Sequence, residues 1–102
     1  MVRVLEAAVS KAKGSRAELR CIRILEAAGY CCTKAGGSLG VFDVIALGPK
    51  DVRCIQVKCG ARPWLSPAER EAIELVTVPP NVSKELWKLR DYARTPDIEV
   101  LK

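Results

Sequence analysis

Apolar residues recur every three or four positions over residues 15–28, at Ala17, Cys21, Ile24, Leu25 and Ala28. This spacing predicts a helix that Gly29 ends, because glycine is favoured just after a helix C-terminus. Ser15 and Glu18 have the S-x-x-E spacing of a capping box, so we expect Ser15 to begin the helix. Residues before Gly14 could also be helical, although a glycine inside a helix weakens its continuity.

Shorter apolar runs bounded by turn residues predict strands over residues 30–34, 41–47 and 52–59. The turn sequence Gly48-Pro49-Lys50-Asp51 joins the last two of them into a hairpin. A second helix is expected from Ser66-Pro67-Ala68-Glu69 to about Leu75, with Ser66 as its cap and Glu69 closing a capping box.

The C-terminal third of the chain admits two interpretations. Val82, Leu86 and Leu89 have helical spacing, but the alternation of side chains around them also fits a strand. We favour strands here and over residues 97–101. A chain of 102 residues has room for one modest core, so we expect one domain.

The predicted hairpin carries the polar groups of greatest interest. If Gly48 pairs with Asp51 across the turn, Asp43 lies directly opposite Gln56, and Lys58 shares their face of the sheet. Cross-strand neighbours approach to about 5 Å between Cβ atoms. The opposite face then holds only apolar pairs, which supports this register (Val44 with Ile55, Phe42 with Val57).

A carboxylate, an amide and a lysine on one face have two interpretations. Asp43 and Lys58 could form a structural ion pair, or this edge could simply face water. Alternatively, Asp43 and the amide oxygen of Gln56 could bind Mg²⁺, which prefers oxygen ligands completed by water and phosphate. Lys58 would then orient a water molecule or stabilise charge on the phosphate. Glu18 is equally open, since it could reach this face or serve only in the capping box.

Composition narrows the chemistry further. The chain has no histidine, which excludes Ser-His-Asp and Cys-His catalysis. Its five cysteines form no C-x-x-C pair, and we interpret them mostly as small buried hydrophobic residues. Lys and Arg outnumber Asp and Glu by 17 to 12, which favours an anionic partner such as nucleic acid. No apolar run approaches the roughly 18 residues of a membrane span, so we expect an intracellular, cytoplasmic protein with no membrane partner.

An ordered set of motifs resembles the archaeal-type Holliday junction resolvases of the PD-(D/E)XK nuclease superfamily. The motifs are Lys13-Gly14-Ser15-Arg16-Ala17-Glu18, Gly29-Tyr30, Gly36-Gly37-Ser38, Val41-Phe42-Asp43-Val44-Ile45-Ala46 and Ile55-Gln56-Val57-Lys58. The resemblance covers residues 13–60 well and the remainder loosely. It implies an α/β, restriction-endonuclease-like fold with a mixed central β-sheet flanked by helices, and a single PD-(D/E)XK nuclease domain over residues 1–102. It also implies a homodimer and Mg²⁺-dependent phosphodiester cleavage, with Mn²⁺ as the alternative ion.

The resemblance assigns roles to individual residues. Glu18, Asp43 and Lys58 match the family's catalytic positions, and Ser38 matches a loop serine near the active site, although it could equally be a hydroxyl in a glycine-rich turn. The chain departs from the family at Gln56, where the usual residue is glutamate. We expect Asp43 and Glu18 to bind the metal, helped by the catalytic-site residue Gln56 and by the backbone carbonyl of Val57. No small-molecule cofactor is expected.

The substrate is expected to be branched DNA held by basic side chains and cut by a dimer. Candidates for phosphate contacts are Lys11, Lys13, Arg16, Arg20, Lys34 and Arg62. Trp64 and Trp87 could anchor a dimer interface or belong to the core. Three functions stay open: a Holliday junction resolvase, another nuclease of the superfamily (flap, repair or restriction-like), and a non-catalytic nucleic-acid-binding module.

Overall fold

The computed structural model describes residues 2–35 and 40–101, with side chains from residue 14 onwards. Ser38 therefore lies outside the described residues, as do the side chains of Lys11 and Lys13. The elements follow the order α1 (Val2–Ala27), β1 (Cys31–Lys34), β2 (Val44–Leu47), β3 (Val52–Gly60), α2 (Pro67–Glu74), β4 (Val82–Arg90) and β5 (Asp97–Leu101). The strands predicted for the C-terminal third are confirmed.

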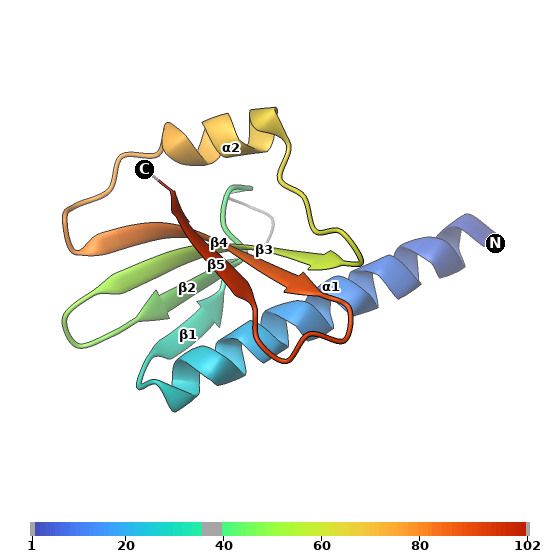
Figure 1. Cartoon of the computed structure of the whole chain (residues 1–102), viewed down its shortest axis with the longest axis horizontal. Coiled ribbons are helices and arrows are strands. Elements are labelled where there is room, and N and C mark those ends of the chain that lie inside the picture. The colour runs from blue at the N-terminus through green and yellow to red at the C-terminus, as the bar shows by residue number, and fades with distance from the viewer. Residues whose placement is uncertain (1, 36–39, 102) are drawn as a thin grey trace.

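The strands form one sheet in the order β1-β2-β3-β4-β5. Only β3 and β4 pair in parallel, and the other neighbours are antiparallel, so the sheet is mixed. Parallel neighbours need a crossover connection, which α2 supplies. α1 covers one face of the sheet and α2 lies over the other (Figure 1). The predicted α/β fold, with a mixed central sheet flanked by helices, is confirmed.

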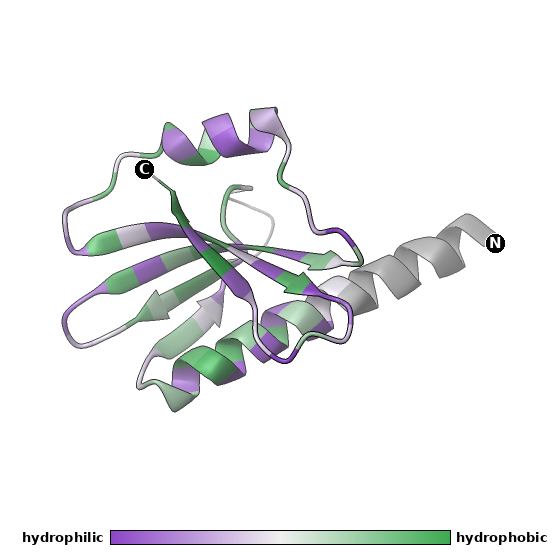
Figure 2. Cartoon of the chain, viewed as in Figure 1, coloured by the Kyte–Doolittle hydropathy of each residue, from purple (hydrophilic) through white to green (hydrophobic). Residues whose placement is uncertain are grey.

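Each face of the sheet has its own hydrophobic cluster. Ala17, Cys21 and Leu25 of α1 pack on one face, against Val44, Ala46, Ile55, Val57, Trp87 and Leu89. On the other face, Leu65 and Ile73 pack against Leu86 and Leu101. Hydrophobic and hydrophilic residues alternate along the strands accordingly (Figure 2). Of the five cysteines, Cys21 is buried, and Cys32 and Cys59 are partly buried against the same cluster. Cys54 is also partly buried and Cys31 is exposed, so the interpretation of most of them as small buried residues holds only in part.

α1 is longer than the sequence pattern predicted. It runs unbroken through Gly14, so Ser15 lies inside the helix and the capping box expected from Ser15 and Glu18 is wrong. The predicted C-terminus is confirmed: Gly29 has a φ of 98°, and the N–H of Tyr30 donates to the carbonyl of Leu25 at 3.0 Å. Among the described residues, no helix is long and apolar enough to cross a membrane.

The hairpin has the predicted register over the length of β2. Val44 pairs with Ile55 and Leu47 pairs with Val52. The expected continuation through Asp43 and Phe42 is wrong. The Asp43 N–H donates to the carbonyl of Ile55, the residue that Val44 already faces, so two residues oppose one, as in a β-bulge. Beyond this bulge, Phe42 packs on the face under α2 rather than opposite Val57.

α2 is held at both ends. Ser66 and Glu69 form the predicted capping box, which is confirmed. At the other end, the buried ammonium of Lys84 donates to the carbonyls of Ile73, Glu74 and Val76 at 3.1, 3.0 and 2.8 Å. Since carbonyls at a helix C-terminus lack partners within the helix, this lysine fixes α2 to the sheet.

Candidate active site

Asp43 lies at the bulge where the chain enters β2. Its Oδ2 atom accepts a hydrogen bond from the Val57 N–H at 2.8 Å, so the carboxylate reaches β3 between Gln56 and Lys58. Burial raises the pKa of Asp43, although the Val57 hydrogen bond and the charge of Lys58 oppose this shift. The predicted backbone pairing of Asp43 with Gln56 is therefore absent. The hydrogen bond from the Val57 N–H nevertheless places the Asp43 carboxylate close to Gln56 and Lys58 in the chain.

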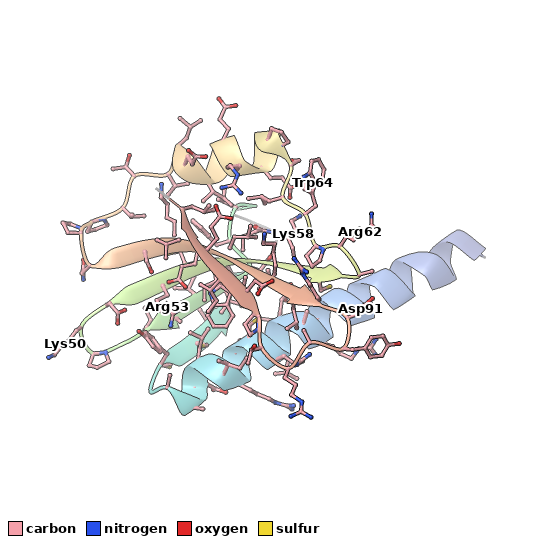
Figure 3. All side chains as sticks on the ribbon, viewed as in Figure 1. Lys50, Arg53, Lys58, Arg62, Trp64 and Asp91 are labelled. Atoms are coloured by element: carbon pink, nitrogen blue, oxygen red, sulfur yellow. The ribbon has the colours of Figure 1, made fainter. Side chains whose placement is uncertain are left out.

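Lys58 points from β3 toward α2 and meets a carboxylate there (Figure 3). Its Nζ atom lies 2.5 Å from Oε2 of Glu69. Hydrogen bonds from Lys58 and then from Ser66 hold the pKa of Glu69 below its usual range. Glu69 is therefore ionised at neutral pH, and its charge also acts on Asp43.

Gln56 lies on the same side of the sheet as Lys58. It lines a hollow of about 70 Å³ together with Glu69, and with Gly40, Val41, Ala72 and Ile73. The amide of Gln56 therefore lies beside a carboxylate that comes from α2. Two negative charges at this point would repel each other, whereas an amide next to Glu69 does not.

Glu18 reaches the same region from α1. Its carboxylate lies 3.8 Å from Nζ of Lys34. Burial raises the pKa of Glu18, the negative charge of Asp43 raises it further, and Lys34 lowers it. The influence of Asp43 means that the two carboxylates predicted from the motifs are electrostatic neighbours, although they come from different elements.

Glu69 is the residue that the sequence analysis missed as a site candidate. Its spacing from Ser66 was fully explained by the capping box, which the structure confirms. Its second contact joins residues on β3 and α2 that are eleven positions apart. The available signal was the crossover itself, because a helix that follows β3 and packs on its polar face must bring its first turn near Lys58.

The donor groups suit a hard cation that keeps part of its water shell. Over the described residues, no three Asp, Glu or Cys side chains lie close enough together to hold a metal ion. Mg²⁺ is commonly bound through one or two carboxylates plus water and substrate phosphate. Asp43 and Glu18, with the amide oxygen of Gln56, fit this mode of binding.

The basic residues proposed for phosphate contacts lie on different parts of the fold and have different partners. Arg16 and Arg20 project from α1 toward the turn between β4 and β5, where Arg20 donates to the carbonyls of Ala93 and Arg94. Lys34 pairs with Glu18, and Arg62 is exposed after the end of β3. Trp87 is 1% exposed and belongs to the core, whereas Trp64 is 68% exposed.

No protein-family model matches this chain, and no curated protein matches it in sequence. A search of solved structures finds a strong likeness to Hjc of Archaeoglobus fulgidus, described as a Holliday junction resolvase from an archaeal hyperthermophile. The TM-score is 0.69 at 20% sequence identity, over 87% of this chain and 71% of the other. This chain has the fold of that resolvase. In this fold, α1 packs against the β2–β3 hairpin, which brings the charge of Glu18 near that of Asp43.

Proposed function

We propose that this protein is a metal-dependent endonuclease that cuts branched DNA, with four-way junctions as the expected substrate. The observation that carries the proposal is the hydrogen bond from the Val57 N–H to Asp43, which holds a carboxylate between Gln56 and Lys58. The resolvase-like fold and the excess of Lys and Arg support a nucleic-acid substrate.

In this proposal, Asp43 and Glu18 hold Mg²⁺, with Mn²⁺ as the alternative ion. The Gln56 amide oxygen and the Val57 carbonyl complete the protein ligands. When bound, the ion would lower the pKa of a water molecule and neutralise charge on the scissile phosphate. Burial favours this role for Asp43, because a carboxylate in low dielectric interacts more strongly with a cation.

Lys58 is proposed to position the attacking water and to stabilise charge that develops on the phosphate. Its ammonium carries three donors, of which one contacts Glu69. The remaining donors can point toward the substrate side while Glu69 keeps the nitrogen in place. Ser38 stays a prediction, as do the phosphate contacts of Lys11, Lys13, Lys34 and Arg62.

A homodimer is part of the proposal, because paired cuts need two active sites at a fixed separation. The exposed Trp64 is compatible with an interface between subunits. Sedimentation velocity of the wild-type protein and of Trp64→Ala tests this part separately.

The test of the function is cleavage of a synthetic four-way junction in Mg²⁺, compared with a flap and an intact duplex of matched sequence. Symmetric paired nicks in the junction alone support a resolvase. Cutting of flaps or duplex supports another nuclease of the same superfamily. Asp43→Ala and Lys58→Ala should each remove cleavage while leaving DNA binding in place. Tight binding without cleavage would make the chain a nucleic-acid-binding module and would contradict the enzyme proposal.

A further inference from the structure

A groove of about 440 Å³ lies between α1 and the turn that joins β4 to β5. None of the residues proposed for catalysis lines it. Arg16 and Arg20 contribute from α1, and Arg90, Asp91 and Tyr92 contribute from the end of β4 and the turn. Three arginines and one aspartate therefore line this groove beside the apolar Ala17, Cys59 and Leu89, which gives the lining a net positive charge.

The turn is fixed in place against α1 and β3. Nη2 of Arg20 donates to the carbonyls of Ala93 and Arg94, at 2.9 and 3.1 Å. The Asp91 N–H donates to the carbonyl of Gly60 at 2.9 Å. These contacts satisfy backbone groups of the turn from two other elements. The groove is consequently formed before any ligand arrives, which lowers the entropic cost of binding.

Tyr92 has an unusual backbone conformation and an unusual environment. Its φ is +65°, in the left-handed region that residues other than Gly, Asn and Asp rarely adopt. Its exposure is 103%, so no packing of the ring compensates for the strain. Strained residues of this kind are concentrated at ligand-binding sites, because the surrounding structure must enforce them. The turn thus presents an aromatic ring to solvent beside a positive groove.

Arg90 is also able to engage a ligand. Its ion pair with Asp97 is weak, because the Nε atom lies 3.5 Å from Oδ2 and both side chains are more than half exposed. A phosphate can replace this interaction or share the guanidinium. Arg16, an exposed residue one turn before Arg20, lies along the same side of α1.

We propose that this groove binds a single-stranded segment of nucleic acid, with phosphates on Arg16 and Arg90 and an unstacked base on Tyr92. A positive groove beside an aromatic ring is the combination by which proteins hold single strands. Flaps, forks and opened branch points offer such bases, whereas an intact duplex keeps its bases stacked. The inference builds on the proposed function, since it assumes a nucleic-acid substrate, and it adds a contact surface apart from Asp43 and Lys58.

The first experiment measures binding by fluorescence anisotropy without divalent metal, using a labelled oligothymidylate and a blunt duplex of equal length. Tyr92→Ala should weaken binding of the single strand by about 5- to 150-fold, the range for loss of one stacked base. Tyr92→Gly should cause the same loss although it relieves the backbone strain. Tyr92→Phe should bind like the wild type. Binding of the duplex should be unchanged in all three variants.

The second experiment measures how the single-strand affinity depends on salt. Arg16→Ala and Arg90→Ala should each reduce the slope of log K against log salt by about 0.7, the value for one phosphate contact on a single strand. Lys50→Ala is the matched control, because Lys50 is also exposed but lies at the opposite end of the sheet from Asp91 (Figure 3). Its slope should equal that of the wild type.

Several results would overturn the inference. These are unchanged single-strand binding by Tyr92→Ala, an equal loss on duplex, or an equal change of slope in Lys50→Ala. A switch from dimer to monomer in Tyr92→Ala would instead make this surface an interface between copies of the chain. Failure of the proposed function is distinct, because the wild type would then cut no DNA in Mg²⁺ while Tyr92-dependent binding persisted. Cleavage with no effect of Tyr92 on binding would overturn only this inference.

Discussion

Lys58 and Glu69 form an ion pair in which Nζ lies 2.5 Å from Oε2, and this contact joins β3 to the first turn of α2. The other carboxylate oxygen, Oε1, accepts a hydrogen bond from the Ser66 N–H at 3.2 Å. One side chain therefore closes the cap of α2 and fixes the proposed catalytic lysine. The two roles can be separated by mutation, because the cap needs only an acceptor oxygen whereas the lysine needs a charge.

Glu69→Gln should keep the cap and lose the ion pair, since glutamine also serves in capping boxes. We expect kcat for DNA cleavage to fall by roughly tenfold or more, as when a positioning contact is lost, while the half-saturating Mg²⁺ concentration stays constant. The loss of stability should stay below about 1 kcal/mol, because Glu69 is 44% exposed. Single-turnover cleavage at varied Mg²⁺ and denaturant unfolding measure these quantities.

The matched control is Glu99→Gln, which removes another ion pair of α2, between Arg70 and Glu99, with 42% exposure of the glutamate. It should leave cleavage unchanged. In a Lys58→Ala background, Glu69→Gln should have no further effect, because the lysine it positions is absent. A higher Mg²⁺ requirement in Glu69→Gln would contradict the positioning role and would indicate that Glu69 binds the metal.

Asp43→Asn should stabilise the protein and abolish cleavage. The asparagine oxygen can still accept from the Val57 N–H, but the half-buried charge is removed. Because burial raises the folded-state pKa of Asp43 above its unfolded value, the ionised carboxylate destabilises the fold at neutral pH. The gain in the free energy of unfolding is on the order of 1 kcal/mol. It should be complete at pH values above the folded-state pKa of Asp43 and should vanish as pH falls below the unfolded-state pKa. Thermal unfolding at several pH values measures it. A destabilised variant at pH 7 would contradict the assigned direction.

Glu85→Gln should destabilise the fold far from the proposed active site. Glu85 is 3% exposed and accepts from Arg53 at 2.7 and 2.8 Å, from Ser83 at 2.6 Å and from Trp87 at 2.9 Å. An amide would direct N–H groups at some of these donors, so we expect a loss of about 3–5 kcal/mol at neutral pH. Denaturant unfolding of both proteins measures this loss.

The same variant makes a prediction about pH. Although burial alone would raise the pKa of Glu85, hydrogen bonds from Arg53, Ser83 and Trp87 keep it below the usual range. Its ionised form therefore stabilises the fold above the unfolded pKa, and this contribution is lost as pH falls through the folded pKa. The difference in the free energy of unfolding between wild type and Glu85→Gln should therefore become smaller as pH falls from the unfolded-state pKa of Glu85 to its folded-state pKa. A difference that is constant with pH would contradict an ionised Glu85.

Lys84→Met should loosen the C-terminal end of α2. Lys84 is 6% exposed, and its ammonium donates to three backbone carbonyls. Without it, the carbonyls of Glu74 and Val76 lose this donor, whereas that of Ile73 keeps a hydrogen bond from the Val76 N–H. We expect a loss of about 2–4 kcal/mol, from unsatisfied carbonyls partly offset by the apolar side chain. Lys84→Arg keeps donor groups and should lose less. Hydrogen exchange of α2 amides reports the loosening, and protection of α2 equal to wild type would contradict the role given to Lys84.

The fold and the hairpin register could be predicted from sequence because local signals and packing agree there. The turn at Gly48–Asp51 and the alternation in β3 both specify the same pairing. α1 shows the opposite case, since Gly14 and the apparent cap at Ser15 indicated a start that the helix does not have. Packing of Ala17, Cys21 and Leu25 against the sheet outweighs a local cost of about 1 kcal/mol for the glycine.

The rest of the site depended on contacts that no local pattern contains. The bulge at Asp43 interrupts a run of apolar residues that fits a continuous strand. Glu69 reaches Lys58 only because α2 crosses over the sheet. Trp64 and Trp87 have the same side chain, yet one is exposed and the other is buried, because β4 lies inside the sheet and the β3–α2 connection does not.

Gln56→Glu tests whether the departure from the family pattern weakens metal binding. If the Gln56 oxygen ligates the metal, a carboxylate there should lower the half-saturating Mg²⁺ concentration by roughly tenfold, equal to about 1.4 kcal/mol. Without metal, the new charge would face Glu69 across a small hollow, so the variant should be less stable than wild type in EDTA. Added Mg²⁺ should then raise its Tm more than that of the wild type, because a ligand stabilises the state that binds it.

Cys54→Ser, on the same face of β3, serves as the control and should leave the Mg²⁺ dependence unchanged. If Gln56→Glu changes neither the Mg²⁺ requirement nor the metal-induced shift in Tm, Gln56 does not touch the ion, and Asp43 and Glu18 alone would have to hold it.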